Sequence, residues 1–140
     1  MIELLSAFTG VFVAVMIVLN GQLSATLGSF FATMVIHIIG LLISILILSL
    51  RRPQWQTIKK VPAQFLLGGT VGVGTTLFNN LAFGKISVSA ILALGLLGQT
   101  ITSIFIDQYG FLGATVQKIT RTKMTGLAFI LTGIVIMVLF

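Results

Sequence analysis

The sequence predicts an all-α integral membrane protein with five transmembrane helices. Charged residues make up 7% of the chain, whereas roughly 25% is ordinary for a water-soluble domain. The mean hydropathy is +1.20, and no Asp, Glu, Lys or Arg interrupts the chain between Glu3 and Arg51. A chain with so few charges cannot cover itself against water, so we expect the lipid bilayer to be its solvent.

The apolar stretches have the length of membrane-spanning helices. A helix needs ~20 residues to cross ~30 Å of hydrocarbon. The stretches are apolar all round, whereas strands of a membrane barrel would alternate apolar and polar residues. We therefore predict a single five-helix domain over residues 1–140. Its spans are placed at residues 4–22, 29–50, 63–83, 87–106 and 123–140.

The first two spans carry few polar side chains, and such groups in hydrocarbon usually face the protein interior or a cavity. Asn20 and Gln22 end the first span and are candidates to line a substrate cavity. His37, Gly40 and Ser44 mark the inward face of the second span. Because His37 has no carboxylate within reach on its own helix, a structural hydrogen bond is the favoured role for this histidine.

The third span contains a ridge of small and polar residues. Gly68, Gly72, Thr76 and Asn80 recur every four residues and share one side of the helix. Small residues at this spacing allow close approach of a neighbouring backbone, so Gly68, Gly72 and Thr76 are predicted to pack against a helix. Asn79 and Asn80 point about 100° apart and cannot both serve one packing seam. At least one of the two amides is therefore expected to face a cavity, and both are candidates. An interhelical hydrogen bond is the alternative role for Asn80.

The fourth span carries a second ridge, formed by Gly95, Gln99, Ser103 and Asp107. Gly95 is predicted to pack, and Gln99 lies near mid-membrane, where water does not complete its hydrogen bonds. We expect Gln99, Ser103 and Asp107 to face a cavity or a subunit interface. For Asp107, a structural role, capping the following turn or pairing with a loop base such as Lys118, is as well supported as a role in transport. The fifth span contributes two predicted packing glycines, Gly126 and Gly133.

The basic residues are distributed unevenly between the two sides of the membrane. Five spans place the termini on opposite sides, and all eight Lys and Arg residues except Lys85 fall on the N-terminal side. Cytoplasmic loops are enriched in Lys and Arg, so we expect the N-terminus inside, the C-terminus outside and Trp55 at the cytoplasmic interface. The basic residues on that side are Arg51, Arg52, Lys59, Lys60, Lys118, Arg121 and Lys123.

The sequence argues against several classes of function. The chain has no cysteine and one histidine, so a thiolate metal site is excluded and no credible catalytic triad can be assembled. The glycine-rich run GGTVGVG lies inside an apolar stretch, and no P-loop lysine follows it. We expect no enzymatic activity, no cofactor and no metal. Nucleic-acid binding is not expected either, because membrane topology accounts for the net charge of +6.

Two segments resemble a known family. The first span ends in LNGQLSATLG, and the fourth span and its exit read GQTITSIFIDQYGFLG, followed by a basic loop and TGLAFILTGIVIMVLF. These segments resemble the DUF606 (YdcZ-like) family, small members of the drug/metabolite transporter superfamily, and the resemblance covers essentially the whole chain. The residues matched to the family pattern are Asn20, Gln99, Asp107, Gly110 and Gly113.

The resemblance implies a five-helix half of an inverted-repeat transporter in the bacterial cytoplasmic (inner) membrane. Such a unit is expected to export a small metabolite or drug-like solute by alternating access, as an antiparallel dimer with a second five-helix subunit. A dual-topology homodimer should have nearly balanced basic residues, so an oppositely oriented homologue is the favoured partner and a homodimer the alternative. The neutral amides favour a neutral polar, zwitterionic or anionic substrate.

Two other functions remain open from the sequence. One is a small dimeric ion channel, with Thr75, Thr76, Phe78 and Asn79 along a narrow anion path. The other is a membrane scaffold that does not transport. The related small multidrug resistance proteins carry a membrane-embedded glutamate that exchanges protons for cations, but this chain has no carboxylate at mid-membrane. Proton/cation exchange by that route is therefore not expected here.

Overall fold

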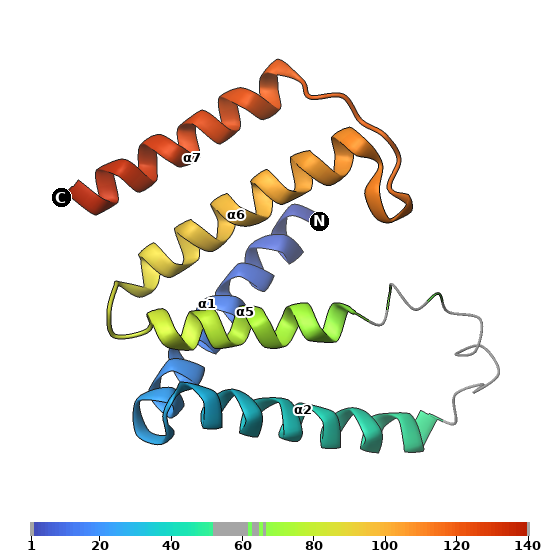
Figure 1. Cartoon of the computed structure of the whole chain (residues 1–140), viewed down its shortest axis with the longest axis vertical. Coiled ribbons are helices and arrows are strands. Elements are labelled where there is room, and N and C mark those ends of the chain that lie inside the picture. Colours follow the sequence, from blue (N-terminus) through green and yellow to red (C-terminus); the bar gives the residue numbers. More distant parts are fainter. Residues whose placement is uncertain (1, 52–61, 63–64, 66, 140) are drawn as a thin grey trace. The chain divides into compact units, whose positions relative to one another are not determined.

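The computed structural model describes residues 2–51, 62, 65 and 67–139, which form five α-helices and a short 3-10 helix (Figure 1). The predicted all-α class is thus confirmed. Residues 63, 64, 66 and 140 of the predicted third and fifth spans lie outside the described residues, as do Arg52, Trp55, Lys59 and Lys60. The helices are α1 (Ile2–Leu27), α2 (Ser29–Arg51), α5 (Gly68–Ala82), α6 (Val88–Tyr109), η1 (Phe111–Gly113) and α7 (Arg121–Leu139).

Within these ranges, three helices are long and apolar enough to cross a membrane: Ile2–Leu27, Ser29–Leu50 and Val88–Tyr109. The described part of α5 has 15 residues, fewer than the ~20 that a span needs. Membrane crossing by α5 and by α7 therefore stays a prediction.

The apolar side chains of the helices point outward. Only Ile17, Ala32 and Ile91 are buried among the described apolar residues, whereas the Phe12 and Phe129 side chains are 72% and 80% exposed. Soluble monomers rarely expose large contiguous apolar patches. The exposed apolar surface is what a protein solvated by lipid requires.

The chain divides into two compact units, Met1–Lys85 and Ile86–Phe140. In the first unit, α1 turns into α2 at Gly28, whose φ of +83° lies in the left-handed region that favours glycine. The Gly28 N–H donates to the Ser24 carbonyl at 2.9 Å, which closes the end of α1. The third helix of this unit, α5, packs against both α1 and α2.

The second unit is a pair of helices that run side by side, α6 and α7 (Figure 1). The Ser87 hydroxyl caps α6 by accepting the Ala90 N–H at 3.2 Å, and α6 ends at Gly110, which is left-handed with φ of +64°. The Thr120 hydroxyl accepts the Lys123 N–H at 3.3 Å at the start of α7. These caps fix where the two helices begin and end.

One glycine permits a close contact between helices. A Cβ atom added to Gly21 of α1 would overlap the ring of Phe83, at the end of α5. The predicted packing glycines have open surroundings instead, because an added Cβ would meet no described atom within 4 Å, and their helix contacts stay a prediction. These glycines are Gly68, Gly72, Gly95, Gly126 and Gly133.

Candidate functional site

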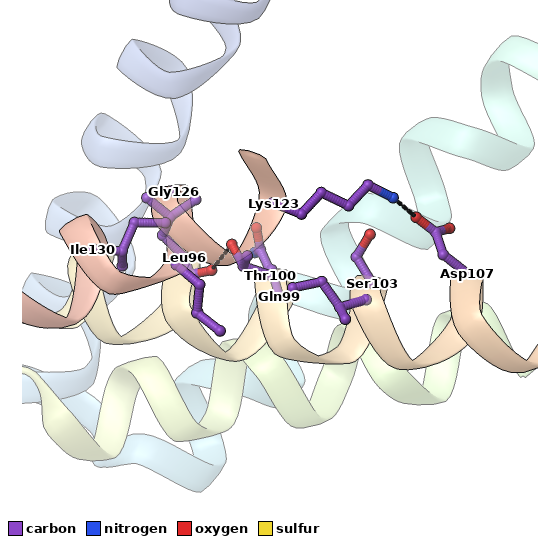
Figure 2. A pocket seen from close by; sticks show the side chains of 10 residues that line it. Leu96, Gln99, Thr100, Ser103, Asp107, Lys123, Gly126 and Ile130 are labelled. Atoms are coloured by element: carbon purple, nitrogen blue, oxygen red, sulfur yellow. Dashed lines mark hydrogen bonds and ion pairs between the residues drawn. The ribbon is translucent and has the colours of Figure 1, made fainter. Parts of the chain in front are cut away.

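The strongest candidate site is an open groove of about 380 Å³ lined by α6 and α7 (Figure 2). Gln99, Ser103 and Asp107 come from successive turns of α6 and lie in one row along it. Their spacing of four residues keeps them on one side of the helix. The structure therefore brings three of the predicted cavity residues together.

An ion pair closes the polar end of the groove. The Lys123 amine donates to Asp107 Oδ2 at 2.8 Å, and the two side chains are 33% and 31% exposed. The partner is thus Lys123, in the first turn of α7, rather than the loop base Lys118. The Asp107 carbonyl also accepts the Gln117 N–H at 2.9 Å and so holds the connection to α7. Because the two side-chain charges compensate each other, the groove has no net charge.

The groove extends from this ion pair to the middle of α6. Gln99 precedes Asp107 by eight residues, and at ~1.5 Å per residue the two lie about 12 Å apart along the axis. Gln99 is the twelfth residue of the 22-residue helix and its side chain is exposed in the groove. The neighbouring Thr100 hydroxyl already donates its hydrogen bond to the Leu96 carbonyl at 2.7 Å. Gln99 therefore offers a polar contact at the depth expected of the membrane centre.

The far end of the groove is apolar, and Gly126 leaves it open. Leu96, Gly126 and Ile130 line this end, as Figure 2 shows. An added Cβ at Gly126 would meet no described atom within 4 Å. A larger side chain at this position would extend into the groove rather than into another helix of the described chain.

A second polar cluster joins the three helices of the first unit. Asn80 is 3% exposed, and its side-chain amide donates to the Thr33 hydroxyl at 3.0 Å. The Asn80 carbonyl lies in the last turn of α5, where carbonyls lack an intrahelical partner. The Ser24 and Ser29 hydroxyls each donate to it at 3.4 Å. The cluster thus satisfies buried polar groups where α1 ends, α2 begins and α5 ends.

The remaining predicted cavity residues also lie in the first unit. Asn20 and Asn79 are half-buried, and Gln22 is exposed. Asn80 lines a separate pocket of about 240 Å³, together with Ser24, Ser29 and Lys85. None of the four predicted amides of this unit lines the α6–α7 groove, whose lining comes from the second unit.

Sequence reasoning missed Lys123 as a groove residue and Thr33 as the partner of Asn80. The signal for Lys123 was its position, because opposite charges at the adjoining ends of consecutive helices can meet. Thr33 lies four residues before His37 and therefore on the same side of α2. The sequence does not show that this side of α2 packs against α5. Among the described residues, no three His, Asp or Glu side chains come together as a metal site.

Apolar helices with an embedded polar groove define an integral membrane protein with a site inside its helical region. A family model described as "Putative inner membrane exporter, YdcZ" matches residues 1–136, and the chain belongs to this family. The predicted membership is thus confirmed. The family description points to membrane export. No curated protein and no solved structure matches the chain.

Proposed function

We propose that the protein is a secondary transporter that exports a small polar solute by alternating access. The observation that carries this proposal is the groove that leads from the Asp107–Lys123 ion pair to Gln99 at the middle of α6. Carriers commonly bind their substrate near the bilayer midplane, at the interface between repeated units. A groove that joins the end of a span to its centre suits both the entry and the binding of a solute.

The charges of the groove support a solute without net charge. A zwitterion would place its ammonium group near Asp107 and its carboxylate near Lys123. Lys123 Nζ and Asp107 Oδ2 lie 2.8 Å apart. A singly charged solute would be attracted by one of these side chains and repelled by the other. Gln99 can both donate and accept a hydrogen bond, so it suits a neutral polar part of the solute.

We further propose that a second five-helix subunit completes the site. Polar groups in the hydrocarbon region are tolerated where they face protein or a water-filled cavity. Within their unit, α6 and α7 supply one wall of the groove, and an inverted pair of subunits is the usual construction of such carriers. The uneven distribution of Lys and Arg favours an oppositely oriented homologue, with a homodimer as the alternative.

The same distribution supports a cytoplasmic N-terminus and an external C-terminus. The chain contains no cysteine, so an introduced thiol is unique. In sealed vesicles, Lys118→Cys and Lys85→Cys should react with an impermeant thiol reagent from opposite sides. Equal labelling of both positions from one side would contradict the single orientation.

Filling the groove at Gly126 tests the proposed transport. Purified protein is reconstituted into vesicles loaded with a bacterial metabolite extract, and the released solutes are identified by mass spectrometry. Gly126→Leu should abolish release and leave the size-exclusion profile unchanged, because the new side chain occupies the groove. Gln99→Leu should have the same effect through loss of the amide.

Gly133→Leu is the matched control. Gly133 lies two turns further along α7, its surroundings are equally open, and it does not line the groove. Wild-type release by Gly133→Leu together with none by Gly126→Leu would support the groove as the transport site. Wild-type release by Gly126→Leu and Gln99→Leu would remove the groove from the transport path.

A further inference from the structure

His37 is the only ionisable side chain that the described helices carry beyond their terminal turns. The other ionisable residues of these helices all lie in a first or last turn: Glu3, Arg51, Asp107, Tyr109, Arg121 and Lys123. His37 lies eight residues inside α2 from Ser29, or about 12 Å along the axis. An ionisable group at this depth is costly and is often functional.

The hydrogen bond of His37 fixes which ring nitrogen is free. His37 Nδ1 lies 2.8 Å from the Thr33 carbonyl oxygen. A carbonyl oxygen only accepts, so Nδ1 carries the hydrogen, and the neutral ring keeps its lone pair on Nε2. A proton can therefore bind at Nε2 without breaking the bond to Thr33. The structural bond and a proton-binding role are thus compatible on one ring.

The pocket around His37 offers no charge to balance a protonated ring. His37 lines a cavity of about 270 Å³ between α2 and α5, with the apolar side chains Phe30, Met34, Val73 and Leu77. In the described chain, α5 carries no ionisable residue, α1 carries only Glu3 in its first turn, and α2 carries Arg51 at its far end. Protonation would place an uncompensated charge among apolar groups.

The free-energy cost of a charged ring in this apolar pocket means that protonation of His37 can change the conformation of the protein. A ligand shifts a conformational equilibrium only by its differential affinity for the two states. A proton on His37 disfavours the present apolar pocket relative to a state in which the ring meets water. Proton binding would thereby bias a carrier between two conformations.

A chain of polar groups leads towards the ring from the ends of α1 and α5. The pocket at these ends contains Asn80 and Lys85. The Asn80 amide donates to the Thr33 hydroxyl at 3.0 Å, and Thr33 also lines the His37 pocket. Asn80 and Thr33 therefore form the polar link between the two pockets.

We infer that His37 is the proton-binding residue that couples solute export to the proton gradient, an inference that rests on the proposed transport function. In each cycle a proton from outside binds to Nε2 of the neutral ring, and the same proton leaves Nε2 on the inside. One solute molecule moves outward in exchange, and no covalent bond of the solute changes. Inward movement of one proton thus drives outward movement of one solute.

An accumulation assay tests this coupling. Vesicles of phosphatidylethanolamine and phosphatidylglycerol hold the protein, with the same metabolite extract on both sides, zero membrane potential and the outside one pH unit more acidic. With one proton exchanged per solute, the outside-to-inside ratio of the transported solute should approach about tenfold. His37→Asn keeps an amide donor near the Nδ1 position but cannot titrate, so its ratio should stay at one.

A second assay, with the extract only inside the vesicles, measures release down the solute gradient. This assay separates the proposal of transport from the inference of proton coupling. If the wild type releases nothing downhill, the transport proposal and this inference both fail. If the wild type releases solute but builds no ratio, or if His37→Asn builds the same ratio, only the coupling is overturned. Downhill release by His37→Asn without accumulation supports the coupling.

A second measurement applies to the wild type alone and does not depend on the folding of a variant. The chain has one histidine, so ¹⁵N-histidine labelling yields a single ring in the NMR spectrum. We expect the Nδ1–H tautomer in lipid vesicles, with Nε2 bare at the alkaline end of a pH series and protonated at its acidic end. A ring that keeps one protonation state throughout the series would overturn the inference.

Discussion

The contact between Gly21 and Phe83 leads to a prediction with the smallest possible perturbation, Gly21→Ala. Gly21 is buried in α1, and one added carbon would overlap three atoms of the Phe83 ring. The Phe83 N–H is donated to the Asn79 carbonyl at 2.9 Å, so the ring is attached to a backbone that is held at the end of α5. Because Cγ is among the overlapped atoms, either the ring must rotate about χ1 or α1 and the end of α5 must shift.

Overpacking of this kind costs about 1–3 kcal/mol. Gly21→Ala should lower the free energy of unfolding in detergent micelles by an amount in this range. Phe83→Ala removes the ring, so it should cancel much of the loss in the double variant. Residues in direct contact show coupling energies of ~0.5–3 kcal/mol in such cycles.

Gly10→Ala is the matched control on the same helix. An added Cβ at Gly10 would meet no described atom within 4 Å, so this variant should lose no stability. Equal unfolding free energies for wild type, Gly10→Ala and Gly21→Ala would refute the reasoning. A zero coupling energy between Gly21 and Phe83 would refute it independently of the size of the single effects.

Two further predictions concern the connection from α6 to α7. Gly110→Ala should lower the free energy of unfolding by about 1–2 kcal/mol and increase hydrogen exchange at the end of α6. Gly110 has φ of +64°, and an added Cβ would lie 2.8 Å from Val116 Cγ2. Unchanged stability and exchange would contradict this prediction. A double-mutant cycle with Asp107→Asn and Lys123→Met should give a coupling energy of at most ~1 kcal/mol, because both side chains are about one-third exposed. A much larger coupling in denaturant unfolding would show that the pair determines the fold.

The helical class followed from the sequence because charge-free stretches leave few alternatives in lipid. The helix ends did not follow from hydropathy. Helix α1 continues beyond Gln22 to Leu27, and α6 continues beyond Ile106 to Tyr109. In both cases the helix stops at a left-handed glycine, Gly28 or Gly110. Hydropathy reports which residues tolerate lipid, whereas glycine and the capping hydroxyls determine where the backbone turns.

The row of polar residues along the groove could be predicted from the sequence, but the ion-pair partner of Asp107 could not. Gln99, Ser103 and Asp107 share one side of α6 because helical geometry alone requires it at this spacing. The pairing of Asp107 with Lys123 depends on the path of the connection between α6 and α7. Similarly, the four-residue ridge on α5 did not reveal which glycine packs closely. Gly21 packs against Phe83 because of the placement of α1 against α5, which local spacing does not encode.

The hydrogen bonds of α5 remove two donors from the alternative of an anion channel. Thr75, Thr76, Phe78 and Asn79 were predicted to line its path, and an anion path requires hydrogen-bond donors along its length. The structure has the Thr75 hydroxyl donating to the Val71 carbonyl at 2.9 Å, and the Thr76 hydroxyl donating to the Gly72 carbonyl at 3.0 Å. Each hydroxyl has a single hydrogen, so neither can serve an anion while these bonds hold. By contrast, the Gln99 amide is exposed in a groove whose charges compensate each other, and this arrangement suits a bound solute better than a stream of ions.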